Sequence, residues 1–535
     1  MSRREMRGRF GFMALLGAVL TLGLAGCVDE EVVFQERPIF QEPPSGAASF
    51  LGYSEQEEGV TVCGNCHQGM QSGWETTGHA DAWAGLQNSG HANESCEGCH
   101  SVNELGNPSE GASGWVATGD PRYQDVQCES CHGPGLDHVD NPDAVRPLAN
   151  IAVGIDLETG CAECHQGTHH PFVEQWSASA HGNVTSFAAG RDGCNSCHDG
   201  ERAISVQFGE SSDWAEQDNG TFEQIVCATC HDPHGSDNIA NLRAPIEEAS
   251  RSHLCVRCHS RQGTPDFEGP NDHGPHAFQG QLVLGEDAGW IPPNSDLTDV
   301  GRIVSTHGTE ANPRLCATCH LPMFEVTDAE TGEFQVQSVG HLFEPIPCPL
   351  DETGVPQESC SLSERNFEAC TESGCHGTVD AARSAMVTVR NRLDDLLDQL
   401  WDDSNGNAVL ETTDGGLLPQ VLAQDLADGD TDGDGNDVEE LDVFDNTFTT
   451  AEGAMWNAQV AWTSENPHWG DGRVDTQAEG FGSHKGSGEG VHNPFLLEAL
   501  LAASINAVEN EYGVTASARV DLSPQMQAPP GVSLR

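Results

Sequence analysis

The hydrophobic pattern of the chain is concentrated at its two ends. A continuous apolar run, "FGFMALLGAVLTLGLA", occupies residues 10–25, and two stretches beyond residue 377 repeat apolar residues with the period of a helix. For the long part between them we expect coil interrupted by short helices. The predicted fold class is therefore mainly α with extensive coil.

The two C-terminal stretches predict amphipathic helices. In "AARSAMVTVRNRLDDLLDQLW", the residues that share one helical face are Ala385, Val389, Leu393, Leu396 and Leu400. In "EGVHNPFLLEALLAASINAVENEY", Asn493 is the predicted N-cap and Pro494 the first helical residue, a position where the missing N–H has no helical partner in any case. Residues 377–535 contain no cysteine, and we expect them to form a C-terminal helical region.

The N-terminal run belongs to an export signal. It follows Arg3, Arg4, Arg7 and Arg9. It closes with "LAGC", which resembles a bacterial lipobox, in which Cys27 is acylated and becomes the mature N-terminus. The alternative is a plain secretory signal followed by a chance cysteine. Val28, rather than Asp, resembles sorting to the outer membrane. We interpret residues 1–27 as a lipoprotein signal peptide with its lipobox.

Composition and charge exclude one class of partner. The formal net charge is −61, whereas recognition of nucleic-acid phosphates needs clustered Lys and Arg. The acidic excess is either a solvated surface or a face that docks a basic redox partner. Aromatic residues make up only 6% of the chain, too little for an ordinary apolar core of this size. Residues 28–60 are acidic and Pro-rich and are expected to form a tether.

The cysteines form a repeat. Eight C-x-x-C-H motifs are present, and the first six begin 32 or 33 residues apart. Their cysteines are Cys63, Cys66, Cys96, Cys99, Cys128, Cys131, Cys161, Cys164, Cys194, Cys197, Cys227, Cys230, Cys255, Cys258, Cys316 and Cys319. The histidines that follow are His67, His100, His132, His165, His198, His231, His259 and His320.

C-x-x-C-H is the attachment signature of c-type haem, in which two thiols bond to the haem and the histidine is the proximal iron ligand. One copy could be half a zinc site or a redox dithiol. A zinc array, however, would pair its cysteine clusters, and a disulfide scaffold would not need the histidines. Stacked haems would also supply the interior that the few aromatic residues cannot. We therefore expect residues 61–376 to form a haem-packed cytochrome core.

A stretched motif, "FEACTESGCHG", predicts a ninth haem. Four residues separate Cys370 from Cys375, and His376 follows. Small cytochromes of sulfate reducers attach haem through C-x4-C-H, which this motif resembles. Cys348 and Cys360 are then free to form a local disulfide, which stabilises by about 3 kcal/mol in the loop-entropy model. In the alternative arrangement, Cys360 replaces Cys370 as the haem thiol across a long loop.

The inventory of side chains favours histidine as the second iron ligand. Fifteen histidines remain after the nine proximal ones, but the chain beyond Cys27 has only five methionines. Ligation of nearly every haem by two histidines is therefore possible, and mainly His/Met ligation is not. Because methionine raises the reduction potential, a bis-His set indicates a low-potential carrier.

Within residues 60–200, "GWETTGHADAW", "CEGCHSVNELG", "VQCESCHGPGLDHV" and "EQWSASAHG" resemble the tetrahaem electron carrier that serves hydroxylamine oxidoreductase. The wider superfamily includes that oxidoreductase, the pentahaem nitrite reductases and octahaem reductases. The resemblance implies the distal ligands His79, His138 and His181. Further candidates are His234, His307 and His341, then His91, His276 and one of His169 or His170. The superfamily's His-Asn-Pro sequence before a C-terminal helix implies His492.

An acidic stretch between the two predicted helices fits a calcium loop. In "DGDTDGDGNDVE", oxygen-bearing side chains take the ligand positions of such a loop around Gly433. They are Asp428, Asp430, Asp432, Asp434, Asn436 and Glu439. Gly435 stands at the position that is usually apolar, and an acidic flexible linker is the alternative.

Two functions fit this chain. One is an electron conduit at the outer cell envelope. The other is a multihaem reductase of a small nitrogen or sulfur oxyanion, which needs one iron with an open distal position. The superfamily's nitrite reductases mark their catalytic haem with C-x-x-C-K, and its hydroxylamine oxidoreductase uses a cross-linked tyrosine. The chain has no such motif, and none of its three tyrosines lies beside a cysteine motif. We favour the conduit and assign no catalytic residue.

The expected setting follows from the signal and the motifs. We expect an outer-membrane lipoprotein that faces the periplasm or the cell surface and is held by its lipid. Its partners would be other redox proteins, such as cytochromes, quinol-linked donors or outer-membrane conduits. Assembly into an oligomer or filament is left open.

Replacement of the lipobox cysteine tests the anchor. Cys27→Ser should move the protein from the membrane to the soluble fraction, because the side chain that carries the lipid is lost. Cell fractionation followed by haem staining measures the shift. A variant that stays with the membrane would place the tether elsewhere in the chain.

Overall fold

The computed structural model describes the chain between residues 49 and 526 with gaps, all within the compact unit Pro43–Arg535. The described residues are 49–90, 92–103, 114–147, 149, 151, 153–155, 160–167, 171–210, 222–271, 273–299, 302–327, 334–351, 355–371, 375–429, 438–445, 447–475, 480, 482–484, 486–516 and 519–526. Cys27, His91, His169 and His170 lie outside them. Among the described helices, none combines the length and apolar character that a membrane span requires.

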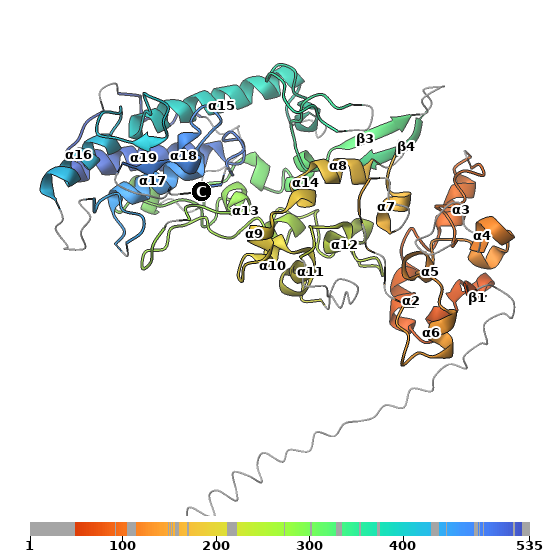
Figure 1. Cartoon of the computed structure of the whole chain (residues 1–535). Coiled ribbons are helices and arrows are strands. Elements are labelled where there is room, and N and C mark those ends of the chain that lie inside the picture. Colours follow the sequence, from red (N-terminus) through yellow and green to blue (C-terminus); the bar gives the residue numbers. More distant parts are fainter. Residues whose placement is uncertain are drawn as a thin grey trace, which may run out of the picture. The chain divides into compact units, whose positions relative to one another are not determined.

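The cytochrome region is built from coil and short helices (Figure 1). The helices are α2 (Gln68–Trp74), α3 (Ala82–Asn88), α4 (Gly114–Thr118), α5 (Cys128–His132), α6 (Leu136–Asp140), α7 (Cys161–Cys164), α8 (Phe172–Ala178), α9 (Ser186–Ala189), α10 (Asn195–His198), α11 (Gly200–Ala203), α12 (Cys227–Cys230), α13 (Gln279–Leu284) and α14 (Cys316–His320). Two small antiparallel sheets pair β1 (Tyr53–Glu55) with β2 (Val60–Thr61) and β3 (Met323–Thr327) with β4 (Phe334–Val339).

The C-terminal region holds the longer helices. They are α15 (Val379–Leu400), α16 (Leu418–Asp428), α17 (Thr450–Ala461), α18 (His468–Asp471) and α19 (Pro494–Tyr512), with one parallel pair, β5 (Val409–Leu410) and β6 (Arg473–Val474). The expectation of a mainly α fold with extensive coil is confirmed.

The cysteine motifs fold as single turns. In five regular motifs the N–H of the histidine donates to the carbonyl of the first cysteine at 2.9–3.1 Å, which closes one helical turn and sets both thiols and the ring around it. In the stretched motif, His376 N–H donates to the carbonyl of Cys370 at 3.3 Å. The longer spacing therefore closes a wider turn between the same two groups.

A duplication spans three motifs. Trp74 Nε1 donates to the carbonyl of Val126 at 2.9 Å, and Trp176 Nε1 donates to that of Ile225 at 2.7 Å. Each acceptor stands two residues before a cysteine motif. Its N–H donates in turn to the carbonyl of the histidine five residues after the tryptophan, at 3.1 and 3.2 Å. The first three motifs and the next three thus share one local architecture.

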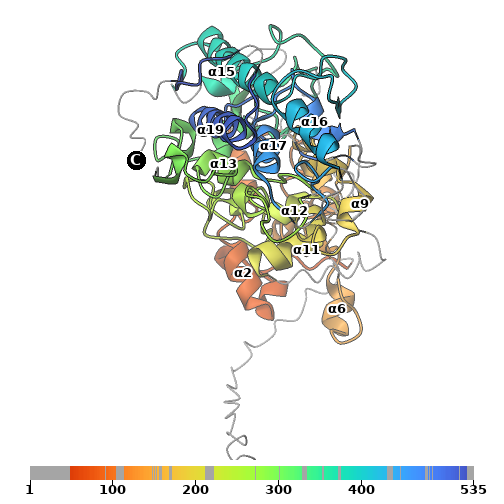
Figure 2. The same ribbon diagram turned by 90° about the vertical axis from the view of Figure 1, so that its left-hand side faces the viewer.

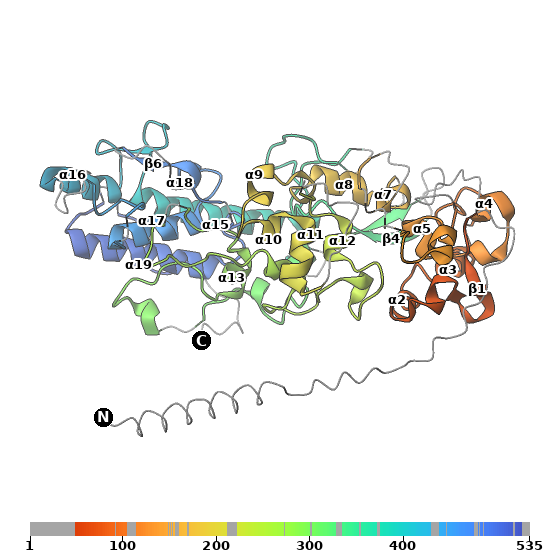
Figure 3. The same ribbon diagram turned by 60° about the horizontal axis from the view of Figure 1, so that its bottom comes forward.

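The main apolar core lies in the C-terminal region. Figures 1 and 3 show α15, α17 and α19 running close together, and the buried side chains between them include Trp401 and Trp456. The stretch around α13 also contributes to this core (Figure 2). Asn457 binds both backbone groups of Trp290, accepting from its N–H at 2.6 Å and donating to its carbonyl at 2.7 Å. The helical core therefore includes residues that precede the last two cysteine motifs.

The ends and faces of the predicted helices are largely as expected. Asn493 caps α19, because its Oδ1 accepts from Leu496 N–H at 3.2 Å. On α15 the prediction that Ala385 is buried is wrong: Ala385 is exposed, and Ala382 and Met386 are buried. The first half of α15 packs in a small cluster with Phe367 and the second half in the main core, so the buried face turns along the helix.

Two glutamates of α19 each pair with an arginine from elsewhere in the chain, and these two ion pairs provide a stability test. Arg392 Nε donates to Glu498 Oε1 at 2.7 Å, and these side chains are only 6% and 4% exposed. Glu498→Ala leaves the guanidinium buried without its counter-charge, so we expect the free energy of unfolding to fall by about 3–5 kcal/mol. Urea unfolding followed by far-ultraviolet circular dichroism measures it.

The matched control is Glu509→Ala, which removes the partner of Arg519, a side chain that is 69% exposed. A surface pair of this kind contributes less than about 1 kcal/mol. Equal losses in the two variants would contradict the argument from burial.

Candidate functional site

We number the cysteine motifs in chain order as sites 1 to 9, so that His67 belongs to site 1 and His376 to site 9. At eight sites the proximal histidine faces a second histidine ring, with ring centroids 6.1–6.4 Å apart. The pairs are His67–His138, His132–His234, His165–His79, His198–His276, His231–His341, His259–His181, His320–His492 and His376–His307. Each described distal candidate faces one proximal histidine.

The separation of the rings fits an iron between them. An iron that binds two imidazole nitrogens at about 2 Å each would hold the ring centroids roughly 6.3 Å apart. Rings in direct contact would lie closer, as at His276 and His484, whose centroids are 4.6 Å apart. The paired residues therefore fit haem iron with two axial histidines.

Backbone carbonyls orient many of these rings. In eight ligand candidates Nδ1 lies 2.6–3.0 Å from a carbonyl oxygen, and these histidines are His100, His132, His138, His231, His307, His320, His341 and His492. A carbonyl can only accept, so Nδ1 carries the proton and Nε2 keeps its lone pair for a metal. The sequence motifs gave no indication of these acceptors.

Burial lowers the pKa of four distal rings to about 4, and these are His181, His276, His341 and His492. A group with a pKa of about 4 is unprotonated at neutral pH, which is the form that binds a metal.

Two other histidines, His100 and His253, do not belong to such a ring pair among the described residues. At site 2, His100 has no partner ring within the described part of the chain, and the candidate His91 lies outside that part. His253, which we did not select from the sequence, uses both ring nitrogens elsewhere. Its Nδ1 accepts from Cys255 N–H at 3.2 Å, and its Nε2 lies 3.1 Å from the carbonyl of Arg314. His253 is therefore a structural residue.

The cysteines divide as the motifs predict. Cys348 and Cys360 form a disulfide, and none of the eighteen motif cysteines, all of them described, takes part in one. Free thiols in every motif are what haem attachment needs, since each must bond to a haem edge.

Two phenylalanines join neighbouring histidine pairs. The ring of Phe172 lies 4.4 Å from His341 and 5.9 Å from His165, measured between centroids. The ring of Phe343 lies 6.0 Å from His341 and 4.5 Å from His181. Neither residue stands in a recognisable motif, so the sequence gave no reason to select them.

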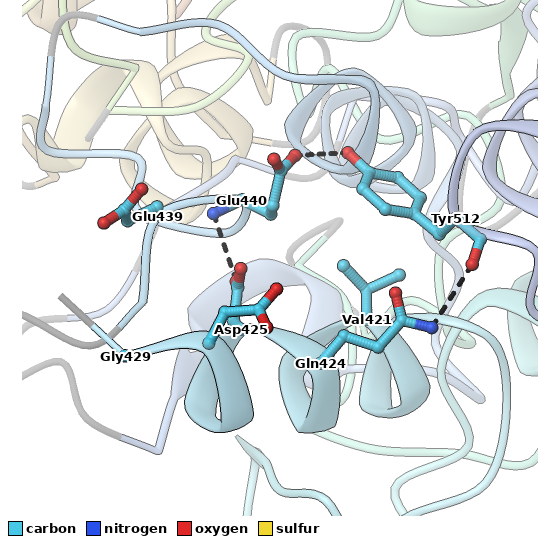
Figure 4. A pocket seen from close by; sticks show the side chains of 8 residues that line it. Val421, Gln424, Asp425, Gly429, Glu439, Glu440 and Tyr512 are labelled. Carbon is cyan, nitrogen blue, oxygen red and sulfur yellow. Dashed lines mark hydrogen bonds between the residues drawn. The ribbon is translucent and has the colours of Figure 1, made fainter. Parts of the chain in front are cut away.

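Two of the predicted calcium ligands line a pocket at the end of α16. Asp428 and Glu439 are placed there with Asp425, Glu440 and Tyr512 (Figure 4). Glu440 N–H donates to Asp425 at 3.1 Å, and the Tyr512 hydroxyl donates to Glu440 at 2.5 Å. The other four predicted ligands lie outside the described residues, and they are Asp430, Asp432, Asp434 and Asn436. Calcium binding stays a prediction.

Comparison with known proteins identifies related sequences. A family model described as "Cytochrome c554 and c-prime" matches residues 62–133, and one described as "Doubled CXXCH motif" matches residues 220–264. The chain is 27% identical to the multiheme cytochrome MtrA of Shewanella baltica over 193 residues, which are 32% of this chain and 54% of MtrA. No solved structure matches the protein.

Two further relatives come from Geobacter sulfurreducens. The C-type polyheme cytochrome OmcC is 31% identical over 127 residues, 21% of this chain and 16% of OmcC. The C-type polyheme cytochrome OmcB is 31% identical over 121 residues, 20% of this chain and 15% of OmcB. The chain thus spans about half of MtrA and less of the other two. With its motifs, these matches show a multihaem c-type cytochrome that binds haem c. The relation to the hydroxylamine oxidoreductase carrier stays a prediction.

The stretched motif can be tested by counting haems. We expect nine per chain by intact mass and iron content, and eight in Cys370→Ala, because that variant loses the first attachment thiol of the stretched motif. The control is Cys348→Ser with Cys360→Ser, which should keep nine. If the control lost a haem and Cys370→Ala did not, Cys360 would be the attached residue.

Proposed function

We propose that this cytochrome is an electron conduit with nine haems, each held by two histidines. The observation that carries the proposal is the facing of all eight described distal candidates with proximal histidines at 6.1–6.4 Å. An iron with two histidine ligands has no open position for a substrate. It can exchange electrons, and the chain's role is to hold the rings and exclude other ligands.

The histidine set also bears on potential. Methionine opposite histidine raises the potential of haem iron, and among the described ring pairs both members are histidines. The net charge of −61 further stabilises oxidised iron, which carries more positive charge than reduced iron. Both terms favour low potentials, and hence donors from the reducing end of a respiratory chain.

The setting that we propose is the outer membrane. Cys27 would carry the lipid, and the part of the acidic stretch that precedes residue 49 would act as the tether that leaves the cytochrome region free to meet partners. The expected tether of residues 28–60 is too long at its end, because Phe50, Leu51 and Tyr53 are buried and β1 begins at Tyr53. Basic redox proteins suit the acidic surface, since opposite charge speeds encounter.

Removal of one distal ligand tests both the ligation and the function. The oxidised wild type should show only low-spin ferric haem by electron paramagnetic resonance, and its reduced form should bind little carbon monoxide. His341→Ala should convert about one haem in nine to a high-spin form that binds carbon monoxide, because it opens the position opposite His231.

His468→Gln is the control, since His468 is buried against Trp401 in the C-terminal region and faces no cysteine motif. It should leave every haem low-spin. A strong high-spin signal in the wild type, together with oxidation of reduced viologen by nitrite, hydroxylamine or tetrathionate, would reverse the proposal in favour of a reductase.

A further inference from the structure

We infer that seven of the nine attachment sites form one continuous line in the order 1–3–4–6–7–8–9, and that sites 2 and 5 are side branches of it. The inference rests on the proposed electron conduit and adds the route through it. A carrier whose sites followed the sequence would pass through all nine in order. The geometry instead points to a branched arrangement with two ends.

Contacts between cysteines of different motifs give the first set of links. Because each thiol bonds to the edge of its haem, two thiols in contact bring two haem edges together. Neighbouring thiols of different motifs, close enough to influence each other's ionisation, are Cys63–Cys128, Cys99–Cys164, Cys161–Cys227, Cys197–Cys258 and Cys255–Cys316. The Sγ atoms of Cys255 and Cys316 lie within 4.8 Å of each other. These pairs link sites 1 and 3, 2 and 4, 4 and 6, 5 and 7, and 7 and 8.

Two further pairs of neighbouring thiols add the links between sites 3 and 4 and between sites 6 and 7. Cys131 of site 3 lies near enough to Cys161 of site 4 for their charges to interact, and the same holds for Cys230 of site 6 and Cys255 of site 7. Site 6 therefore links site 4 to site 7 through its two cysteines. Among the described residues, the thiol of Cys99 at site 2 neighbours site 4, and that of Cys197 at site 5 neighbours site 7.

The aromatic rings support the same route independently of the cysteines. Phe172 lies between His165 of site 4 and His341 of site 6. Phe343 lies between His341 and His181, which faces the proximal histidine of site 7. Rings in contact give an electron a more continuous path than solvent does. The two phenylalanines thus join sites 4, 6 and 7 without touching site 5.

Backbone carbonyls support the link between sites 7 and 8 and add the last link, between sites 8 and 9. Phe343, beside the site 7 pair, offers its carbonyl to His320 of site 8 at 2.6 Å. The carbonyl of Val491 accepts from His307 of site 9 at 2.7 Å, and the next residue, His492, faces His320 of site 8. Sites 8 and 9 are therefore held by consecutive residues.

Exposure identifies the ends of the line. Of the eighteen motif cysteines, Cys66 of site 1 and Cys375 of site 9 are exposed, and the other sixteen are partly covered. These two sites stand at opposite ends of the inferred order. A partner must approach a haem edge closely to exchange an electron with it, and an exposed attachment site allows this. We therefore assign docking of redox partners to sites 1 and 9.

The duplication of three motifs explains the branches. The links among sites 1, 2, 3 and 4 are 1–3, 2–4 and 3–4, and the links three motifs later are 4–6, 5–7 and 6–7. The tryptophan contacts to Val126 and Ile225 repeat with the same offset. One module therefore contributes two sites to the line and one side branch.

Two ligand replacements distinguish a branch site from a line site. His276→Met at site 5 and His341→Met at site 6 should each raise the potential of one haem, which then takes up the first electron. Low-spin ferrous iron is diamagnetic, so neighbouring ferric haems lose their magnetic coupling to it. When each protein has taken up one electron, the electron paramagnetic resonance signals of the haems next to the reduced one should change. We expect about one ferric haem with a changed signal in His276→Met and about two in His341→Met. Two altered neighbours for both variants would overturn the branched order.

The ligand assignment is read separately. A redox titration that shows no raised potential in either variant would refute the bis-His proposal at these sites. The order of the sites is then tested by a second measurement, the positions of the irons in an experimental structure of the haem-loaded protein. We expect the site 7 iron as the nearest neighbour of the site 5 iron, and a site 5 iron between those of sites 4 and 6 would overturn the inference.

Discussion

The pairing of two histidine rings across one position is the constraint on which the cytochrome region depends. The rings come from separate segments, as in His67 with His138 and His320 with His492. With an iron bound between its rings, each pair would tie two parts of the chain together as a cross-link does. Among the described residues of this region the apolar clusters are small, such as Phe50, Val102 and Tyr123, whereas the large core lies around the C-terminal helices. Coil suffices here because the ligand pairs, rather than side-chain packing, set the distances.

The same constraint explains several strained backbone positions. Ala240 and Phe343 have positive φ values of 52° and 59°, in a region that side chains rarely adopt, and their carbonyls accept from Nδ1 of His231 and His320. Leu315, with φ 44°, directly precedes the site 8 motif. Strain of this kind costs about 1–3 kcal/mol per residue and persists where the surroundings over-determine the conformation. Here each histidine ring is fixed on one side by the carbonyl of the strained residue and on the other by the ligand pair, and this arrangement can maintain the strained conformation.

Features that depend on residues close together in the sequence could be predicted, whereas contacts between distant residues could not. The motifs, the cap at Asn493 and the mainly α fold class follow from neighbouring residues, and they could be predicted. The set of distal candidates could also be selected, but the sequence gave no means of matching them to sites, because His79 faces site 4 and not the nearer motifs. The carbonyl acceptors and the bridging rings of Phe172 and Phe343 depend on the tertiary fold alone. The face of α15 was misjudged at Ala385 because two separate cores divide that helix.

The C-terminal helical region has a physical role in this scheme although it holds no cysteine. Asn493 caps α19 through its Oδ1, and its Nδ2 donates to the carbonyls of Leu282 and Ile303 at 3.0 and 2.9 Å. The residues immediately before it, Val491 and His492, serve sites 9 and 8. One short segment therefore fixes a helix in the apolar core, a ligand and the acceptor of a second ligand. This segment thereby connects the apolar core to sites 8 and 9 through the start of a helix. Site 5 also touches the C-terminal region, because the ring of His276 lies 4.6 Å from that of His484 and Phe278 belongs to the same core. The C-terminal core thus helps to hold particular ligand pairs, whereas others, such as His67 with His138, lie in the coil-rich part of the chain.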